Sequence, residues 1–293
     1  MGNTLYLECN MGISGDMMVA SLIDLGVDQE KLKKALDSLC VSGYECIVSR
    51  VKKAGLDVCD FNVKLEHDNN DHNMEYLYGH THEHNGHHHE HEHSHDGHHH
   101  EHEHSHHEHG HSHGEHHHEH RGLKDIILII DKSDLTDNAK NIAKRIFTII
   151  AEAEAKAHGE NIENVHFHEV GAVDSIVDIA AIAFCIDYLN IERVFVPNLI
   201  DGRGSVRCQH GIIPVPVPAV VNIITNHHIK LKLTNIEGEL VTPTGAAVVA
   251  AIRTDDKIPE EFTIKRVGLG AGKRNYGRPS ILRAFLIEIC DNI

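Results

Sequence analysis

Residues 4–27 read TLYLECNMGISGDMMVASLIDLGV and contain a strand, a loop and a helix in direct succession. Residues 4–9 are mostly apolar and short, as in a buried strand, and residues 17–27 carry the apolar spacing of a helix. Gly26 is a natural stop for that helix. A strand that feeds a helix through a glycine-containing loop predicts that helices and a sheet pack on each other in this fold.

The loop inside this stretch has the composition of an anion-binding corner. Ser14 or Asp16 is placed to cap the helix, and Gly12 and Gly15 allow backbone amides to approach a phosphate or a carboxylate. An ordinary capped turn has the same residues, so the pattern is compatible with both interpretations.

Outward from this stretch, helices and strands alternate irregularly. Asp28 is a predicted N-cap for a helix at residues 28–39, and two alternating segments within residues 44–66 predict antiparallel strands that turn near Ala54 and Gly55. We therefore expect an α+β (mixed α/β) fold, with short mixed sheets, packed helices and no regular parallel repeat. Further helices are predicted at residues 136–158, 175–189 and 246–252, strands at 193–197, 229–233, 263–272 and 280–289, and a loop at 201–211.

One segment departs from this composition. Residues 80–120 contain 23 of the 31 histidines, nine acidic residues and neither lysine nor arginine. Such a segment has too little apolar surface to offset the entropy of ordering, so we expect a disordered, metal-binding insert at residues 68–121. The folded domain is then expected to comprise residues 1–67 and 122–293.

Charge and hydropathy narrow the classes of partner. The net charge is −17, and −8 remains without residues 80–120, so a nucleic-acid partner is not expected. No apolar run is long enough to cross a bilayer, and the N-terminus lacks the features of a secretory signal. Seven cysteines form no C-x-x-C pair, which favours reduced thiols in the cytoplasm. Because no apolar run is long enough, no membrane association is expected.

The segment HFHEVGAVD contains the best candidates for a metal centre outside the insert. His166 and His168 point to the same side if this segment is extended, and Glu169 adds a carboxylate. Two imidazoles and one carboxylate suit nickel, zinc, iron or cobalt and leave coordination positions for a substrate. Asp174 and Asp178 follow at the start of a helix, where they are placed to orient an imidazole or bind a metal-bound water. Alternatively, these polar residues cap and solvate that helix.

Two further segments are candidate sites for an anionic ligand. In LVTPTGAA, Thr242 and Thr244 flank a proline before a helix, as in a phosphate cradle or in a plain turn. In DGRGSVRCQHG, Asp201 and Arg203 lie on a glycine-rich loop that would present charge to a ligand.

A glycine-rich segment near the C-terminus, GLGAGKRNYGRP, is followed by a strand pattern. A dinucleotide-binding motif would be followed by a helix, so this segment is interpreted as a basic loop. Lys273, Arg274 and Arg278 are its candidates for contact with a phosphate-bearing ligand.

Five segments, taken in order, resemble the LarC nickel-insertion family. They are LYLECNMGISGDM, HFHEVGAVDSIVDI, DGRGSVRCQHGIIPVPVPA, GELVTPTGAA and GLGAGKRNYGRPSILRA, and they extend from Leu5 to about Leu286. Many members of that family carry a histidine-rich insert of variable length at the position of residues 80–120.

The resemblance implies an enzyme, a lyase that inserts nickel into pyridinium-3,5-bisthiocarboxylic acid mononucleotide. The product is the nickel-pincer cofactor of lactate racemase and related enzymes, and the reaction is a cyclometallation. Family members are described as CTP-dependent, with Mn or Mg on the nucleotide. They continue past the GRPSILR segment into a domain that binds CTP, so this chain is expected to be the N-terminal part and to work with that partner half.

On this basis we assign roles to the matching residues. His166, His168 and Glu169 are expected to bind nickel, and Asp16 or Asp174 to accept a proton. The remaining candidates, for contact with oxygen atoms of the mononucleotide, are Ser14, Gly15, Arg203, Thr242 and Thr244. Expected partners are the pincer mononucleotide, the CTP-binding half, the nickel-pincer enzyme and a second copy of the chain in a homo-oligomer.

Two other functions are compatible with the sequence. In a nickel store or metallochaperone, the histidine-rich segment would itself be the functional part. In a phosphate-ester hydrolase, Asp16, Asp174 and Asp178 would hold two metal ions.

Overall fold

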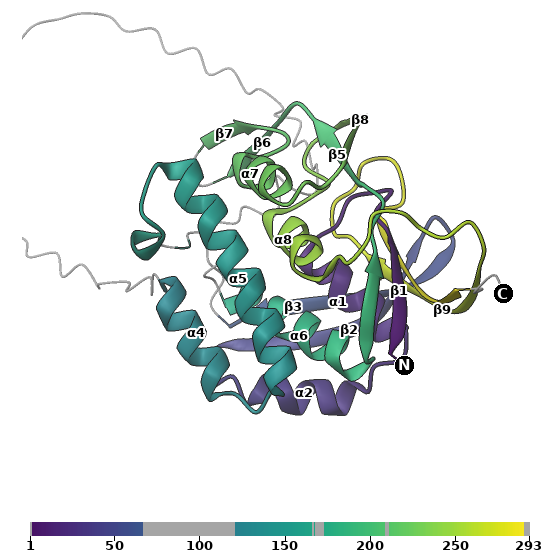
Figure 1. The fold of residues 1–293 in the computed structure, drawn as a ribbon, viewed down its shortest axis with the longest axis horizontal. Helices are drawn as coiled ribbons and strands as arrows, with labels where there is room; N and C mark the ends of the chain where they lie inside the picture. The colour runs from purple at the N-terminus through teal and green to yellow at the C-terminus, as the bar shows by residue number, and fades with distance from the viewer. Residues whose placement is uncertain (1, 67–120, 166, 168–172, 209–210, 290–293) are drawn as a thin grey trace, which may run out of the picture.

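The structure, a computed structural model, describes residues 2–66, 121–165, 167, 173–208 and 211–289 (Figure 1). Its main element is a six-stranded mixed sheet with the order β2-β3-β9-β10-β1-β4. β1 pairs antiparallel with β10 and parallel with β4, and β3 pairs parallel with β9. The predicted α+β class is confirmed. The strands are β1 (Asn3–Glu8), β2 (Tyr44–Lys53), β3 (Leu56–Leu65), β4 (Ile191–Phe195), β9 (Phe262–Ala271) and β10 (Ile281–Ile289).

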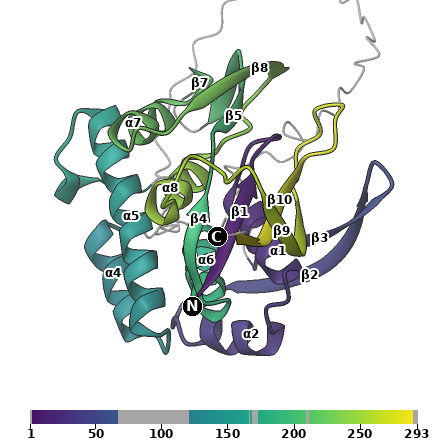
Figure 2. The ribbon, with the colours of Figure 1, turned by 45° about the vertical axis from the view of Figure 1, so that its right-hand side comes forward.

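Helices cover one face of this sheet in successive layers. α1 contacts β9 and β10, α6 packs on α1, and α5 packs on α6. Figures 1 and 2 show α4 and α5 on the outside, farthest from the sheet. α6 lies between the other layers, and its apolar side chains are buried on nearly every side. The helices are α1 (Gly15–Asp24), α2 (Gln29–Asp37), α4 (Leu123–Lys132), α5 (Asp137–His158), α6 (Val173–Tyr188), α7 (Pro218–Asn226) and α8 (Pro243–Ile252), with a 3₁₀ turn at η1 (Ile162–Asn164).

Local signals explain several boundaries. Asp28 caps α2 by accepting hydrogen bonds from the backbone N–H groups of Glu30 and Lys31. Thr136 caps α5 in the same manner, and Gly159 ends it in the left-handed conformation. These features confirm the predicted helices at residues 28–39 and 136–158.

The segment at residues 201–211 differs from its prediction as a loop. It contributes to two small sheets, in which β5 (Leu199–Arg203) pairs with β8 (Leu231–Glu237) and β6 (Ser205–Cys208) pairs with β7 (Gly211–Pro214). These strands have only four to seven residues, so their periodicity is too short to outweigh the glycines that interrupt it.

The glycines of the GLGAG segment serve packing between a helix and a strand. Gly268 and Gly270 lie on β9, where an added Cβ atom would collide with the backbone carbonyls of Ser21 and Met17. α1 therefore lies directly on the backbone of β9. The segment continues into β10, as the interpretation against a dinucleotide motif requires.

Candidate functional site

A pair of backbone hydrogen bonds joins the loop before α1 to the segment before α8. The N–H of Ile13 donates to the carbonyl oxygen of Leu240 at 3.0 Å, and the N–H of Thr242 donates to the carbonyl oxygen of Ile13 at 3.1 Å. Two helix N-termini that are more than 200 residues apart in the chain thereby lie side by side. The dipoles of both helices place a partial positive charge at this junction.

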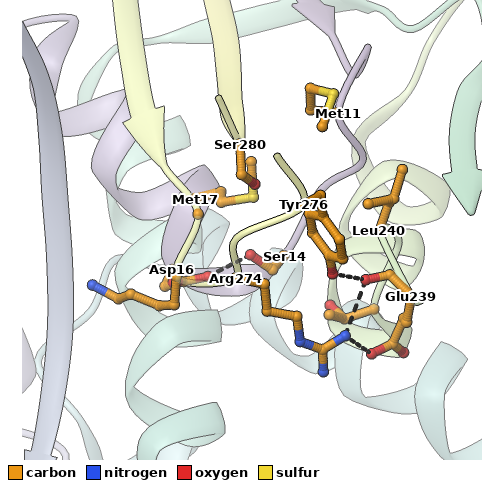
Figure 3. Close-up of a pocket in the computed structure, with 12 residues that line it drawn as sticks. Met11, Ser14, Asp16, Met17, Glu239, Leu240, Arg274, Tyr276 and Ser280 are labelled. Atoms are coloured by element: carbon orange, nitrogen blue, oxygen red, sulfur yellow. Dashed lines mark hydrogen bonds and ion pairs between the residues drawn. The ribbon is translucent and has the colours of Figure 1, made fainter. Parts of the chain in front are cut away.

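A cavity of about 210 Å³ lies at this junction (Figure 3). One wall comes from the loop before α1 and the first turn of that helix, and the others come from the segment before α8 and from the connection between β9 and β10. Its lining residues are Met11, Ser14, Asp16, Met17, Glu239, Leu240, Thr242, Gly272, Lys273, Arg274, Tyr276 and Ser280.

Two consecutive cations in the connection between β9 and β10 contact carboxylates. The Nζ of Lys273 lies 2.5 Å from an oxygen of Asp60 on β3. The Nη1 of Arg274 donates to the carboxylate of Glu239 at 2.9 Å and to the backbone carbonyl of the same residue at 3.0 Å. The hydroxyl of Tyr276 also donates to that carbonyl, at 2.5 Å, so Arg274 and Tyr276 fix one wall of the cavity (Figure 3).

Asp16 brings a carboxylate with altered acidity to the cavity. Burial raises its pKa above the ordinary value, and the hydrogen bond from the Ser14 hydroxyl and the charge of Lys273 only partly offset this effect. A carboxyl group with a raised pKa binds a proton more readily, which is the property that a general base needs near neutral pH.

Asp178 on α6 lies directly behind this carboxylate. One of its oxygens would be 2.5 Å from a Cβ atom placed on Gly15, so only glycine leaves room for it at the first position of α1. Burial, together with the charges of Asp16 and Asp174, raises the pKa of Asp178 well above the ordinary value. Three aspartates from α1 and α6 are thus electrostatically coupled beside the cavity.

The structure brings some of the predicted site residues together and leaves others apart. Ser14, Asp16 and Thr242 line the cavity, and Gly15 adjoins it. Asp174 lies in the first turn of α6. The predicted nickel ligands His166, His168 and Glu169 lie outside the described residues.

Arg203 and Thr244 are not among the described residues that line the cavity. The exposed side chain of Arg203 donates through Nε to the carbonyl oxygen of Thr234, at 2.6 Å. Thr244 lies within the first turn of α8, where the capping side chain is that of Thr242.

Glu239 and Tyr276 contribute to the site although neither was a sequence candidate. Their role depends on contacts with Arg274, which is 35 residues from Glu239. Both lie inside the segments that carry the family resemblance, GELVTPTGAA and GLGAGKRNYGRPSILRA. Membership in those segments was the sequence signal that could have identified both residues as part of the site.

The family model of the nickel insertion protein matches residues 5–292. The chain belongs to the nickel insertion protein family. The family match contains every described residue that lines the cavity, from Met11 to Ser280.

Several relatives share the name pyridinium-3,5-bisthiocarboxylic acid mononucleotide nickel insertion protein. The one from Alkaliphilus metalliredigens is 48% identical over 98% of this chain and 61% of its own length. The one from Clostridium acetobutylicum is 45% identical over 97% of this chain and 64% of its own length. The one from Acetivibrio thermocellus is 37% identical over 96% of this chain and 60% of its own length.

The chain spans about three-fifths of the length of the curated relatives that it matches. No solved structure matches it significantly. Within the described ranges, no helix has the length and apolar character needed to cross a membrane. In the same part of the chain, no three His, Cys, Asp or Glu side chains are grouped closely enough to hold a metal ion.

Proposed function

We propose that this chain inserts nickel into pyridinium-3,5-bisthiocarboxylic acid mononucleotide, the compound that appears in the names of its relatives. The observation that carries this proposal is the convergence of three distant family segments on one cavity. The cavity combines cations and helix N-termini for an anionic ligand with a carboxylate of raised pKa.

The phosphate of the mononucleotide is proposed to lie next to Lys273 and Arg274. Both cations contact carboxylates in this structure, and a phosphate dianion is a stronger acceptor for them. Ser14 and Thr242 add hydroxyl groups at the N-termini of α1 and α8. In this arrangement Lys273 and Arg274 take the role that the sequence suggested for Arg203.

The reaction replaces a carbon–hydrogen bond of the pyridinium ring by a carbon–nickel bond. The ring carbon binds Ni²⁺ and loses H⁺, so the site needs a proton acceptor and involves no change of oxidation state. Asp16 is the proposed acceptor because its carboxylate lies in the cavity and burial raises its pKa. Asp178 is proposed to take the proton onward to Asp174, since the charges of both Asp16 and Asp174 act on Asp178.

The remaining assignments follow from the resemblance. His166, His168 and Glu169 are proposed to deliver nickel to the cavity as exchangeable ligands. CTP with Mn or Mg is proposed to bind a partner that corresponds to the unmatched two-fifths of the relatives. The proposal also includes cytoplasmic location, a homo-oligomer and transfer of the product to a lactate racemase-type enzyme.

Replacement of a nickel ligand tests the metal assignment. In His168→Ala, we expect formation of the nickel-pincer cofactor to fall by at least about 100-fold, because loss of even an indirect metal contact costs about 10–100-fold. The assay is lactate racemase activation with the CTP-binding partner present.

His158→Ala is the matched control, because His158 lies at the C-terminal end of α5 and is paired with Glu154. It is expected to retain activation. Undiminished activation by His168→Ala would contradict the metal assignment.

Deletion of residues 80–120 separates insertion from nickel storage. With excess nickel, we expect the deleted protein to activate lactate racemase as the full chain does. With scarce nickel, activation should fail, because 23 imidazoles in one segment of the same chain raise the local nickel concentration. A Gly/Ser segment of equal length controls for chain connectivity, and complete loss under both conditions would favour the storage function.

A further inference from the structure

Residues 238–242, here called the strap, form the wall of the cavity before α8. On one side of the strap, Arg274 and Tyr276 donate to the carbonyl oxygen of Glu239. At its centre, the carbonyl oxygen of Leu240 accepts from the N–H of Ile13. The position of the strap sets where Glu239 and Thr242 lie in the cavity.

Two N–H groups of the strap, those of Leu240 and Val241, donate to a single carboxylate. Asp201 on β5 is fully buried, and its Oδ1 accepts from the N–H of Leu240 at 2.8 Å and from that of Val241 at 3.1 Å. The same oxygen accepts from the N–H of Gly202 at 2.7 Å. One oxygen atom therefore holds three backbone groups in place.

The other oxygen of Asp201 has a different environment. Oδ2 is buried and has no hydrogen-bond partner among the residues that the structure describes. Burial raises the pKa of this carboxyl group, an effect that the three backbone N–H groups partly offset. A fully buried carboxylate is expensive to retain for stability alone, which points to a role in the geometry of the strap.

Gly202, the residue after Asp201, allows β5 to lie directly against residues 236–238. A Cβ atom on Gly202 would collide with the backbone carbonyls of Gly238 and Ile236. Asp201 and Gly202 thus form a short clamp, in which glycine permits close approach and the carboxylate binds the strap. The sequence suggested that Asp201 presents charge to a ligand from a loop, whereas the structure buries it in a strand.

We propose that Asp201 is a positioning residue for the cavity, which holds the strap so that Glu239, Thr242 and, through Glu239, Arg274 are arranged for the ligand. This inference rests on the proposed function for the identity of that ligand, a pyridinium mononucleotide. The hydrogen bonds that define the clamp do not depend on that identity.

Two substitutions of Asp201 separate its acceptor oxygen from its charge. Asp201→Asn keeps one acceptor oxygen of the same reach, whereas Asp201→Ala leaves the N–H groups of Leu240 and Val241 without their acceptor. Asp28→Ala is the matched control, since Asp28 also accepts two backbone N–H groups, at the start of α2. If Asp201→Ala fails to fold, Asp201→Ser replaces it, because the shorter hydroxyl cannot reach both N–H groups.

The first measurement is the affinity of the whole chain for nicotinic acid mononucleotide, a pyridinium mononucleotide without thiocarboxylates. Asp201→Ala is expected to raise Kd by about 10-fold or more, as for the loss of a buried acceptor. Asp201→Asn and Asp28→Ala are expected to stay within about 3-fold of the wild type, which is under 1 kcal/mol.

The second measurement is amide hydrogen exchange at Leu240 and Val241. These amides should lose protection in Asp201→Ala and keep it in Asp201→Asn and Asp28→Ala. Unchanged protection in Asp201→Ala would overturn the proposal, as would equal loss of affinity in Asp201→Asn and Asp201→Ala. If the wild type fails to bind the mononucleotide, the proposed function is contradicted, while amide exchange still decides the role of Asp201.

Discussion

Asp16→Asn is expected to reduce formation of the nickel-pincer cofactor by at least about 100-fold, the usual contribution of a positioned proton acceptor. The amide has nearly the shape of the carboxyl group and cannot accept the proton that the ring carbon loses. Binding of the mononucleotide and of nickel should remain. Single-turnover insertion with both substrates at saturation measures the effect on the chemical step.

The pH profile gives this experiment a second readout. Burial raises the pKa of Asp16, so the proton-accepting carboxylate accumulates only as pH rises through that raised value. Wild-type insertion should therefore increase with pH over this range, and Asp16→Asn should lose the increase. Asp57→Asn is the control, because Asp57 is an exposed residue of β3 that forms an ion pair with Arg50 on β2. Wild-type activity in Asp16→Asn, or an unchanged profile, would exclude Asp16 as the base.

The raised pKa of Asp16 also affects the stability of the fold. Its pH dependence is opposite to that of a carboxylate in a salt bridge, whose pKa is lowered. A carboxyl group with a raised pKa in the folded state contributes stability below its unfolded pKa of about 3.9. That stability is lost as pH rises through the folded pKa. Above its folded pKa the charged Asp16 therefore opposes folding, and there Asp16→Asn should unfold at a temperature no lower than that of the wild type.

Arg274→Gln is expected to weaken mononucleotide binding by about 100-fold and to destabilise the fold. The substitution removes the proposed phosphate contact and the ion pair with Glu239, whose side chain is 9% exposed. Breaking a buried ion pair costs about 3–5 kcal/mol. We expect the lower end of this range because the Arg274 side chain retains 28% exposure. Thermal unfolding and direct binding measure the two effects.

A double substitution separates stability from binding at this pair. Glu239→Gln combined with Arg274→Gln removes both charges of the pair, so it should recover part of the stability without recovering affinity. Arg283→Gln is the matched control, because Arg283 also pairs with a glutamate, Glu8, and does so outside the cavity. If Arg274→Gln binds the mononucleotide as tightly as the wild type does, the proposed placement of the phosphate is contradicted.

Local patterns were sufficient to predict much of the fold. The cap at Asp28, the helix that ends at Gly159 and the hairpin that turns at Ala54 and Gly55 depend on residues near one another in the chain. The strands within residues 199–214 depend instead on pairing with β8 and with each other. That pairing is absent from the local periodicity, so residues 201–211 were predicted as a loop.

The site was predictable only in part, for a related reason. Ser14, Asp16 and Thr242 are recognisable from their neighbours, as polar residues beside glycine or proline at the start of a helix. The pairing of Lys273 with Asp60 joins residues that are 213 positions apart. No sequence pattern specifies such a contact, nor does one show that Asp201 is buried beneath the strap.

The hydrogen bonds between Ile13 and the strap limit how early the cavity can form during synthesis of the chain. Ile13 is synthesised early, but its partners Leu240 and Thr242 follow more than 220 residues later. β1 pairs equally late, because its antiparallel neighbour is β10, the last strand of the part of the chain that the structure describes. The histidine-rich segment is thus synthesised well before the residues that complete the cavity, so the cavity can form only late in synthesis of residues 1–289.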